Sequence, residues 1–167
     1  MTQLSSAEDY FLNVLKSNND EFFNNPSTFA NALNLATSLY HFHEWLYAYF
    51  RSNLERHFGT NFANPRDFWR MVEQTNKNFG YIRDLTNASK HVAIGQRKTS
   101  TGMSHIANTH IVSQGYGIGR YGQGRFGGGP NVVFEDGGSL ISFDQCASDL
   151  FAYWNTLLEA LTGKLYL

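Results

Sequence analysis

Apolar residues recur at every third or fourth position through most of the first 91 residues, which is the spacing of amphipathic helices. Capping and stop signals divide this pattern into four predicted helices. The first begins in the capping box Ser5-Ser6-Ala7-Glu8 and ends in the Asn/Asp-rich stretch 18–25. The others are expected from about Ser27 to Phe58, from Asn64-Pro65 to about Asn78, and from about Tyr81 to His91, with breaks at Gly59 and Gly80.

After residue 92 the pattern changes to short, partly β-branched segments separated by turn residues, which predicts strands. The expected strand segments are 92–98, 104–113, 131–135 and 139–143. Glu135-Asp136-Gly137-Gly138 joins the last two as a hairpin turn. Asp144 is expected to cap a final helix that Gly163 ends.

This order of elements predicts the α+β class: a mainly helical bundle with a small antiparallel sheet inserted before the C-terminal helix. A chain of 167 residues fits one compact domain, so a single domain over 1–167 is expected. Its helical part would comprise 1–91 and 144–163. The β-insert would comprise 92–143 and contain a Gly-rich loop at 115–129.

Composition narrows the class of protein. Hydrophobic residues make up 42% and aromatic residues 16% of the chain, which excludes a disordered protein. The single cysteine, Cys146, excludes a disulfide scaffold and is interpreted as small core packing. No apolar run approaches about 18 residues, and the N-terminus does not resemble a signal peptide, so a cytoplasmic protein without membrane contact is expected. The aromatic surplus predicts exposed rings and hence a homodimer seated on the helical half.

The net charge is −1, but the charged residues are distributed unevenly along the chain. The segment 1–76 carries −3, the segment 77–125 carries +6, and the segment 126–167 carries −4. A basic middle of this kind predicts a polyanionic or phosphate-bearing partner. The alternative is that the basic segment only neutralises the acidic helices against which it folds.

The Gly-rich segment 115–129 contains eight glycines and a literal G-x-G-x-x-G. More glycine and a proline follow it instead of a helix, so a dinucleotide site is not predicted. Arg120 and Arg125 alternate with aromatic residues in this segment, which is compatible with RNA binding by stacking and charge. A flexible hairpin loop is the alternative interpretation.

The segment 83–91 is the strongest candidate for chemistry. On a helical wheel, polar side chains gather on one face opposite an apolar one; they are Arg83, Asp84, Asn87, Lys90 and His91. Arg83 and Lys90 would hold a phosphate and His91 would exchange a proton, which together would support metal-independent RNA cleavage. The alternative is a solvated helix face on which Asn87 and Lys90 cap the helix end.

The predicted site therefore has catalytic residues Arg83, Asp84 and His91, and ligand-binding residues Asn87, Lys90, Arg120 and Arg125. No metal site and no cofactor are predicted. His41 and Glu44 share a helix face but lack a third metal ligand, and His43 is expected to be a hydrogen-bonded core histidine.

The segment Asp84-Leu85-Thr86-Asn87-Ala88-Ser89-Lys90-His91, together with Phe151 and Trp154, resembles a widespread set of uncharacterised bacterial proteins over most of the chain. The helical half also resembles HEPN domains, many of which are ribonucleases of toxin and phage-defence systems. In those domains an Arg, a following polar residue and a His after four to six intervening residues form the active site, usually across a dimer. The resemblance implies these roles for Arg83, Asp84 and His91, although seven residues intervene here.

The sequence thus predicts a HEPN-like protein that binds RNA or another phosphate-bearing ligand, with ribonuclease activity as the extended hypothesis. Two alternatives stay open. One is a non-catalytic module that binds a protein partner through its aromatic surface. The other is a small-molecule pocket between the bundle and the sheet.

Overall fold

A computed structural model describes residues 4–91, 99, 101–103, 105–113 and 130–166. Helices and a three-stranded antiparallel sheet placed before the last helix confirm the predicted α+β class. The helical elements are α1 (Ala7–Tyr10), the π-helical turn η1 (Phe11–Leu15), α2 (Lys16–Asn24), α3 (Phe29–Phe58), α4 (Pro65–Thr75), α5 (Asn78–His91), the 3₁₀ turn η3 (Ile106–Asn108) and α6 (Phe143–Thr162). The strands are β1 (Thr109–Ser113), β2 (Pro130–Asp136) and β3 (Ser139–Ser142).

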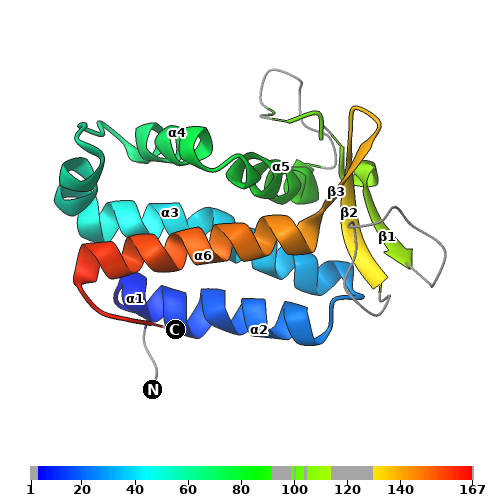
Figure 1. Cartoon of the computed structure of the whole chain (residues 1–167), viewed down its shortest axis with the longest axis horizontal. Helices are drawn as coiled ribbons and strands as arrows, with labels where there is room; N and C mark the ends of the chain where they lie inside the picture. The colour runs from blue at the N-terminus through cyan, green and yellow to red at the C-terminus, as the bar shows by residue number, and fades with distance from the viewer. Residues whose placement is uncertain (1–3, 92–98, 100, 104, 114–129, 167) are drawn as a thin grey trace.

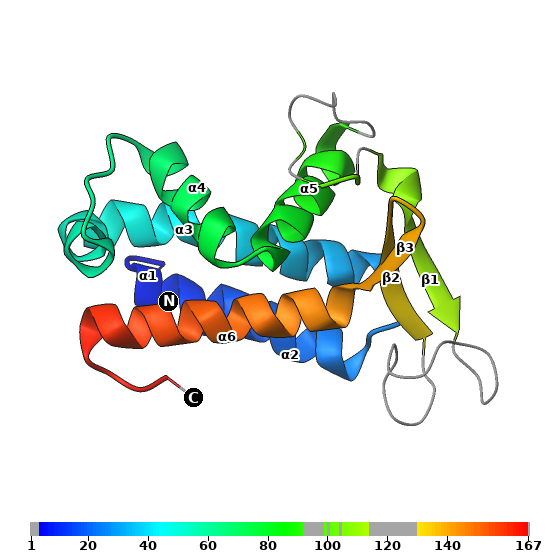
Figure 2. The same cartoon turned by 45° about the horizontal axis from the view of Figure 1, so that its top comes forward.

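Helices α3 and α6 run side by side through the middle of the bundle (Figure 1). The helices α1 and α2 lie on one side of this pair, and α4 and α5 lie on the other (Figures 1 and 2). The sheet stands at one end of the bundle, where α6 leaves β3. This arrangement gives α5 contacts with both α3 and α6.

The central helix pair is joined by Trp154, which is fully buried in α6. Its indole Nε1–H donates a hydrogen bond of 2.9 Å to the carbonyl of Leu39 in α3. The Trp154 ring also packs edge-on against Phe42 and Phe79 at 5.7 and 6.1 Å between ring centroids. The buried indole is thus both packed and hydrogen-bonded, as a ring with a polar handle requires.

Several predicted helix ends are confirmed. The Asn64 side chain accepts hydrogen bonds from the backbone N–H groups of Arg66 and Asp67, with Pro65 in the first helical position of α4. Gly59 and Gly163 end α3 and α6 in the left-handed region, with φ of 65° and 70°.

Other predicted helix ends are wrong. Ser6, not Ser5, caps α1, since its hydroxyl accepts from the N–H of Asp9. The stretch 18–25 continues the helix to Asn24 because Phe22 is buried against the core. Gly80 lies buried inside α5, and α6 begins one residue before Asp144.

The sheet has the order β1-β2-β3, with both pairs antiparallel. The predicted hairpin turn is confirmed at Gly137 and Gly138, both of which have positive φ. The expected strand 104–113 is shorter than predicted, because η3 precedes β1. The expected strand 92–98 and the Gly-rich loop 115–129, with Arg120 and Arg125, lie outside the described residues.

The segment 101–103 packs between α5 and the β2–β3 hairpin. Met103 is fully buried, and Gly102 lies directly against the Asp136 carboxyl group. A Cβ added at Gly102 would lie 2.0 Å from Asp136 Oδ1. The Asp136 side chain accepts a hydrogen bond of 2.7 Å from the Tyr81 hydroxyl of α5, so it is not free to move away. Glycine is therefore required by this close approach.

Replacing Gly102 by alanine should lower the free energy of unfolding by roughly 1–3 kcal/mol, because the new methyl group overpacks the contact with Asp136. Chemical denaturation of Gly102→Ala, Asp136→Ala and the double variant measures this. We expect the cost of Gly102→Ala to shrink sharply in the Asp136→Ala background. Equal costs in both backgrounds would contradict the close approach.

Candidate functional site

Helix α5 separates the predicted site residues instead of presenting them together. Arg83 is 6% exposed and Asp84 is fully buried, whereas Lys90 and His91 are exposed and Asn87 is half-buried. The expectation of one solvated polar face is therefore wrong for Arg83 and Asp84. The two side chains are buried because α4 and the segment 101–103 pack over this part of α5. A helical wheel contains no information about tertiary contacts of this kind.

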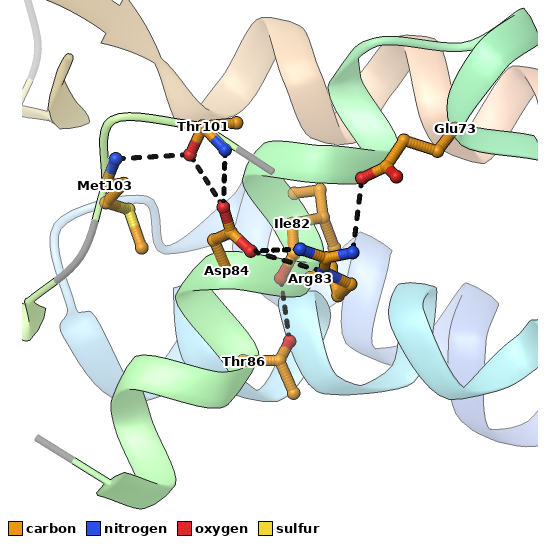
Figure 3. A network of polar contacts seen from close by, with 7 residues as sticks. All are labelled: Glu73, Ile82, Arg83, Asp84, Thr86, Thr101 and Met103. Atoms are coloured by element: carbon orange, nitrogen blue, oxygen red, sulfur yellow. Dashed lines mark hydrogen bonds and ion pairs between the residues drawn. The ribbon is translucent and has the colours of Figure 1, made fainter. Parts of the chain in front are cut away.

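Arg83 lies in a network of polar contacts between α4 and α5 (Figure 3). Its Nε and Nη2 donate to Asp84 Oδ1 at 3.2 and 3.0 Å. Its Nη1 lies 3.4 Å from Glu73 Oε1 of α4. The guanidinium also stacks over the Trp69 ring of α4, with 4.7 Å from Cζ to the ring centroid. Arg83 therefore ties α5 to α4.

Asp84 uses its second carboxylate oxygen to hold the segment 101–103. Its Oδ2 accepts from both the backbone N–H and the hydroxyl of Thr101, each at 2.8 Å. The Thr101 hydroxyl oxygen in turn accepts from the Met103 N–H at 3.2 Å (Figure 3). A fully buried carboxylate is tolerated here because an arginine and two further donors compensate its desolvation. Arg83 and Asp84 thus have a structural role, although the sequence pattern predicts catalysis.

Arg83→Ala should destabilise the fold by about 3–5 kcal/mol, because it leaves a buried carboxylate without its cation. If Arg83 lay on a solvated helix face, as the helical wheel predicts, the same substitution would leave the fold intact. Arg70→Ala is the matched control, since Arg70 also lies over Trp69, at 6.0 Å, but is exposed. Its cost should stay below about 1 kcal/mol. Urea unfolding measures the free energy of unfolding of both variants. Equally small losses of this free energy in the two variants would contradict the structural role of Arg83.

The exposed end of α5 lies against α3. Lys90 Nζ is 3.5 Å from His41 Nε2, and His41 Nδ1 is 3.4 Å from Glu44 Oε2. An ammonium group can only donate, so Nε2 of His41 acts as acceptor. The proton of a neutral His41 ring then sits on Nδ1 and points to the carboxylate. Glu44, His41 and Lys90 thus form a carboxylate–imidazole–ammonium series on the surface.

His41 and Glu44 are site residues that sequence reasoning missed. Their three-residue spacing marks them as neighbours on one helix face, and the sequence prediction considered this pair only as metal ligands. Lys90 lies 49 residues away from His41. Only the packing of α3 against α5 brings Lys90 to this pair.

The structure does not bring Arg83 and His91 together. His91 ends α5, eight positions after Arg83, which is about 12 Å along a helix axis. Its ring is exposed, whereas α4 and neighbouring residues of α5 enclose the Arg83 guanidinium. A second copy of the chain docking on this end of α5 would therefore meet Lys90 and His91 but not Arg83.

Two further sequence predictions concern buried groups, and both are confirmed. His43 is a core histidine whose Nδ1 donates to the backbone carbonyl of Tyr40. Burial lowers the pKa of His43, which keeps the ring neutral. Cys146 is buried in α6, and burial raises its pKa to about 12, so it stays a thiol and contributes packing.

The buried His43 predicts an acid sensitivity. Its pKa is lowered in the folded protein, so below the unfolded value of 6.5 the unfolded chain binds more protons than the folded one. Stability should therefore fall as the pH drops below about 6.5, by at most about 1.4 kcal/mol per pH unit from this residue. His43→Asn keeps a donor for the Tyr40 carbonyl and removes the titration. Urea unfolding between pH 7.5 and 5 should show a shallower loss in His43→Asn; parallel curves would contradict the assignment.

The described part of the chain holds no group of three His, Cys, Asp or Glu side chains that could bind a metal ion. None of its helices combines the length and the apolar character needed to cross a bilayer.

Comparisons of the chain with protein-family models, with curated proteins and with solved structures find no match. The resemblance to HEPN domains therefore stays a prediction.

Proposed function

We propose that this protein binds RNA or another phosphate-bearing ligand at the exposed end of α5. Lys90 is the principal cation of this site, with His41 and His91 beside it. The observation that carries the proposal is the distance of 3.5 Å between Lys90 Nζ of α5 and His41 Nε2 of α3, which brings the two side chains together at the surface. Arg83 and Asp84 hold α5 in place and do not contact the ligand.

The charge environment of Lys90 supports this proposal. Within the described ranges no carboxylate forms an ion pair with Lys90, whereas Lys16 and Lys164 each pair with one. An exposed ammonium group of this kind retains its donors for an anion. In sequence, α5 leads directly into a segment that contains Arg97 and Lys98, which adds positive charge to the same part of the chain.

The same site has groups suited to RNA cleavage without a metal. A carboxylate that holds an imidazole in one tautomer is the arrangement that prepares a general base. In the proposal, Lys90 turns from His41 Nε2 to a phosphate oxygen, and the freed Nε2 takes the 2′-hydroxyl proton while Glu44 orients the ring through Nδ1. The 2′-oxygen attacks phosphorus to form a 2′,3′-cyclic phosphate, the bond from phosphorus to the 5′-oxygen breaks, and the proton on His41 passes to the departing 5′-oxygen. This chemistry fits a cytoplasmic ribonuclease of a toxin or phage-defence system. It places the base on α3, whereas the sequence pattern places it at His91.

Lys90→Ala should weaken the binding of labelled RNA several-fold, at about 1 kcal/mol or more, because it removes a phosphate contact. The slope of log K against log salt should also fall by about 1. Lys77→Ala is the matched control: Lys77 is an exposed lysine of the same basic segment and lies just before α5. Fluorescence polarisation at two or more salt concentrations measures both quantities.

The proposal fails if the protein does not bind RNA at low salt, or if the Lys77 and Lys90 variants behave alike. Gel analysis of the same RNA after incubation without added metal reports cleavage. Cleavage that survives in His41→Ala would remove His41 from the mechanism, since loss of a general base costs about 10²–10⁴ in rate.

A further inference from the structure

Four aromatic rings stack on one another between the core and the surface of α3. Tyr10 of α1 lies between Phe42 and Trp45, with centroid separations of 6.0 and 4.9 Å and interplanar angles of 9° and 25°. Trp45 then stacks on Tyr49 at 6.0 Å and 4°. Phe42 is fully buried and Tyr49 is 50% exposed. The stack therefore runs from the core to solvent.

This stack shares a face of α3 with the proposed phosphate site. His41, Trp45 and Tyr49 follow one another at intervals of four residues, so they lie along one side of the helix. His41 at one end contacts Lys90, and Tyr49 at the other end is the most exposed of the four stacked rings. From His41 to Tyr49 the helix rises about 12 Å. That length corresponds to about three or four stacked nucleotides.

Glu44 indicates which part of a nucleic acid would lie on this face. Its side chain is 55% exposed. Burial raises the pKa of Tyr10 in the stack and the charge of Glu44 helps to raise it, so a phosphate placed over the rings would meet a carboxylate. Bases carry no such charge, and every base has a face that stacks on an aromatic ring. A duplex presents mainly its phosphates to the outside, whereas a single strand can turn its bases to the protein.

We propose that this face of α3 is a base-stacking platform and that the RNA bound at Lys90 is single-stranded. One phosphate lies at the Lys90–His41 pair, and a base further along the strand stacks on the outer face of Tyr49, since Tyr10 and Tyr49 already cover the two faces of Trp45. This inference rests on the proposed function and names its substrate class. Because Trp45, itself backed by Tyr10, already holds the Tyr49 ring, the platform is ordered before the RNA binds, and little conformational entropy is lost.

The test uses the full chain and three probes: a short single-stranded RNA, the same strand with abasic sugars at its centre, and the corresponding duplex. Tyr49→Ala should weaken the single strand about five- to hundredfold, the range that stacking of one base covers. Phe29→Ala is the matched control, since Phe29 is also an exposed ring of α3 but lies about 160° around the helix. The wild-type protein should bind the abasic strand and the duplex more weakly than the intact strand.

Tryptophan fluorescence of the wild-type protein gives a second readout, because Trp45 stacks directly beneath Tyr49. The intact strand should quench it, and the quenching should be lost in Trp45→Phe. The inference is overturned if Tyr49→Ala and Phe29→Ala bind the single strand alike, or if abasic and intact strands bind equally. Lys90→Ala separates the two proposals: a loss of binding there with no effect of Tyr49→Ala keeps the phosphate site and removes the platform.

A second copy of this chain is the competing occupant of the exposed rings. Analytical ultracentrifugation of the wild-type protein and of Tyr49→Ala distinguishes it. If Tyr49→Ala converts a dimer to a monomer and leaves RNA affinity unchanged, the ring face is an interface between copies and the platform is refuted. A monomer in both cases, with RNA affinity lost in the variant, supports the platform.

Discussion

The buried carboxylate of Asp84 is the constraint on which the arrangement of α5 depends. One of its oxygens accepts from Arg83, and the other accepts twice from Thr101. A charge buried in this way is stable only while these donors stay in place. Arg83 also pairs with Glu73 of α4. The buried Arg83–Asp84 pair therefore ties α5 to α4 and to the segment 101–103. Three successive pieces of chain are thus held in one orientation.

This orientation determines which polar groups of α5 are left for a partner. Arg83 and Asp84 are used inside the protein, and the last turn of the helix leaves Lys90 and His91 in solvent. That last turn meets α3 at His41, at the end of a helix face that also carries Trp45 and Tyr49. The proposed RNA site is therefore a surface built from two helices, and the buried ion pair acts on it only by holding α5.

Much of the fold follows from local signals in the sequence. The Asn64-Pro65 cap, the Gly59 and Gly163 stops and the Gly137-Gly138 turn each depend on a few adjacent residues, and each is found as predicted. The site does not follow in this way. Whether Arg83 is exposed depends on Glu73 and Trp69, and whether Lys90 has a neighbour depends on His41. Helical periodicity gives the face of each residue but not the element that covers this face.

Hydrogen exchange at the backbone amide of Thr101 tests the central role of Asp84 most directly. This N–H donates to the buried carboxylate at 2.8 Å, although it lies in a short segment outside any helix or strand. The Asp84 anchor predicts that this amide exchanges as slowly as the amides inside α5, because both open only when the buried ion pair opens. Exchange as fast as in an exposed loop would show that Asp84 does not hold the segment, and would contradict this account of how α5 is oriented.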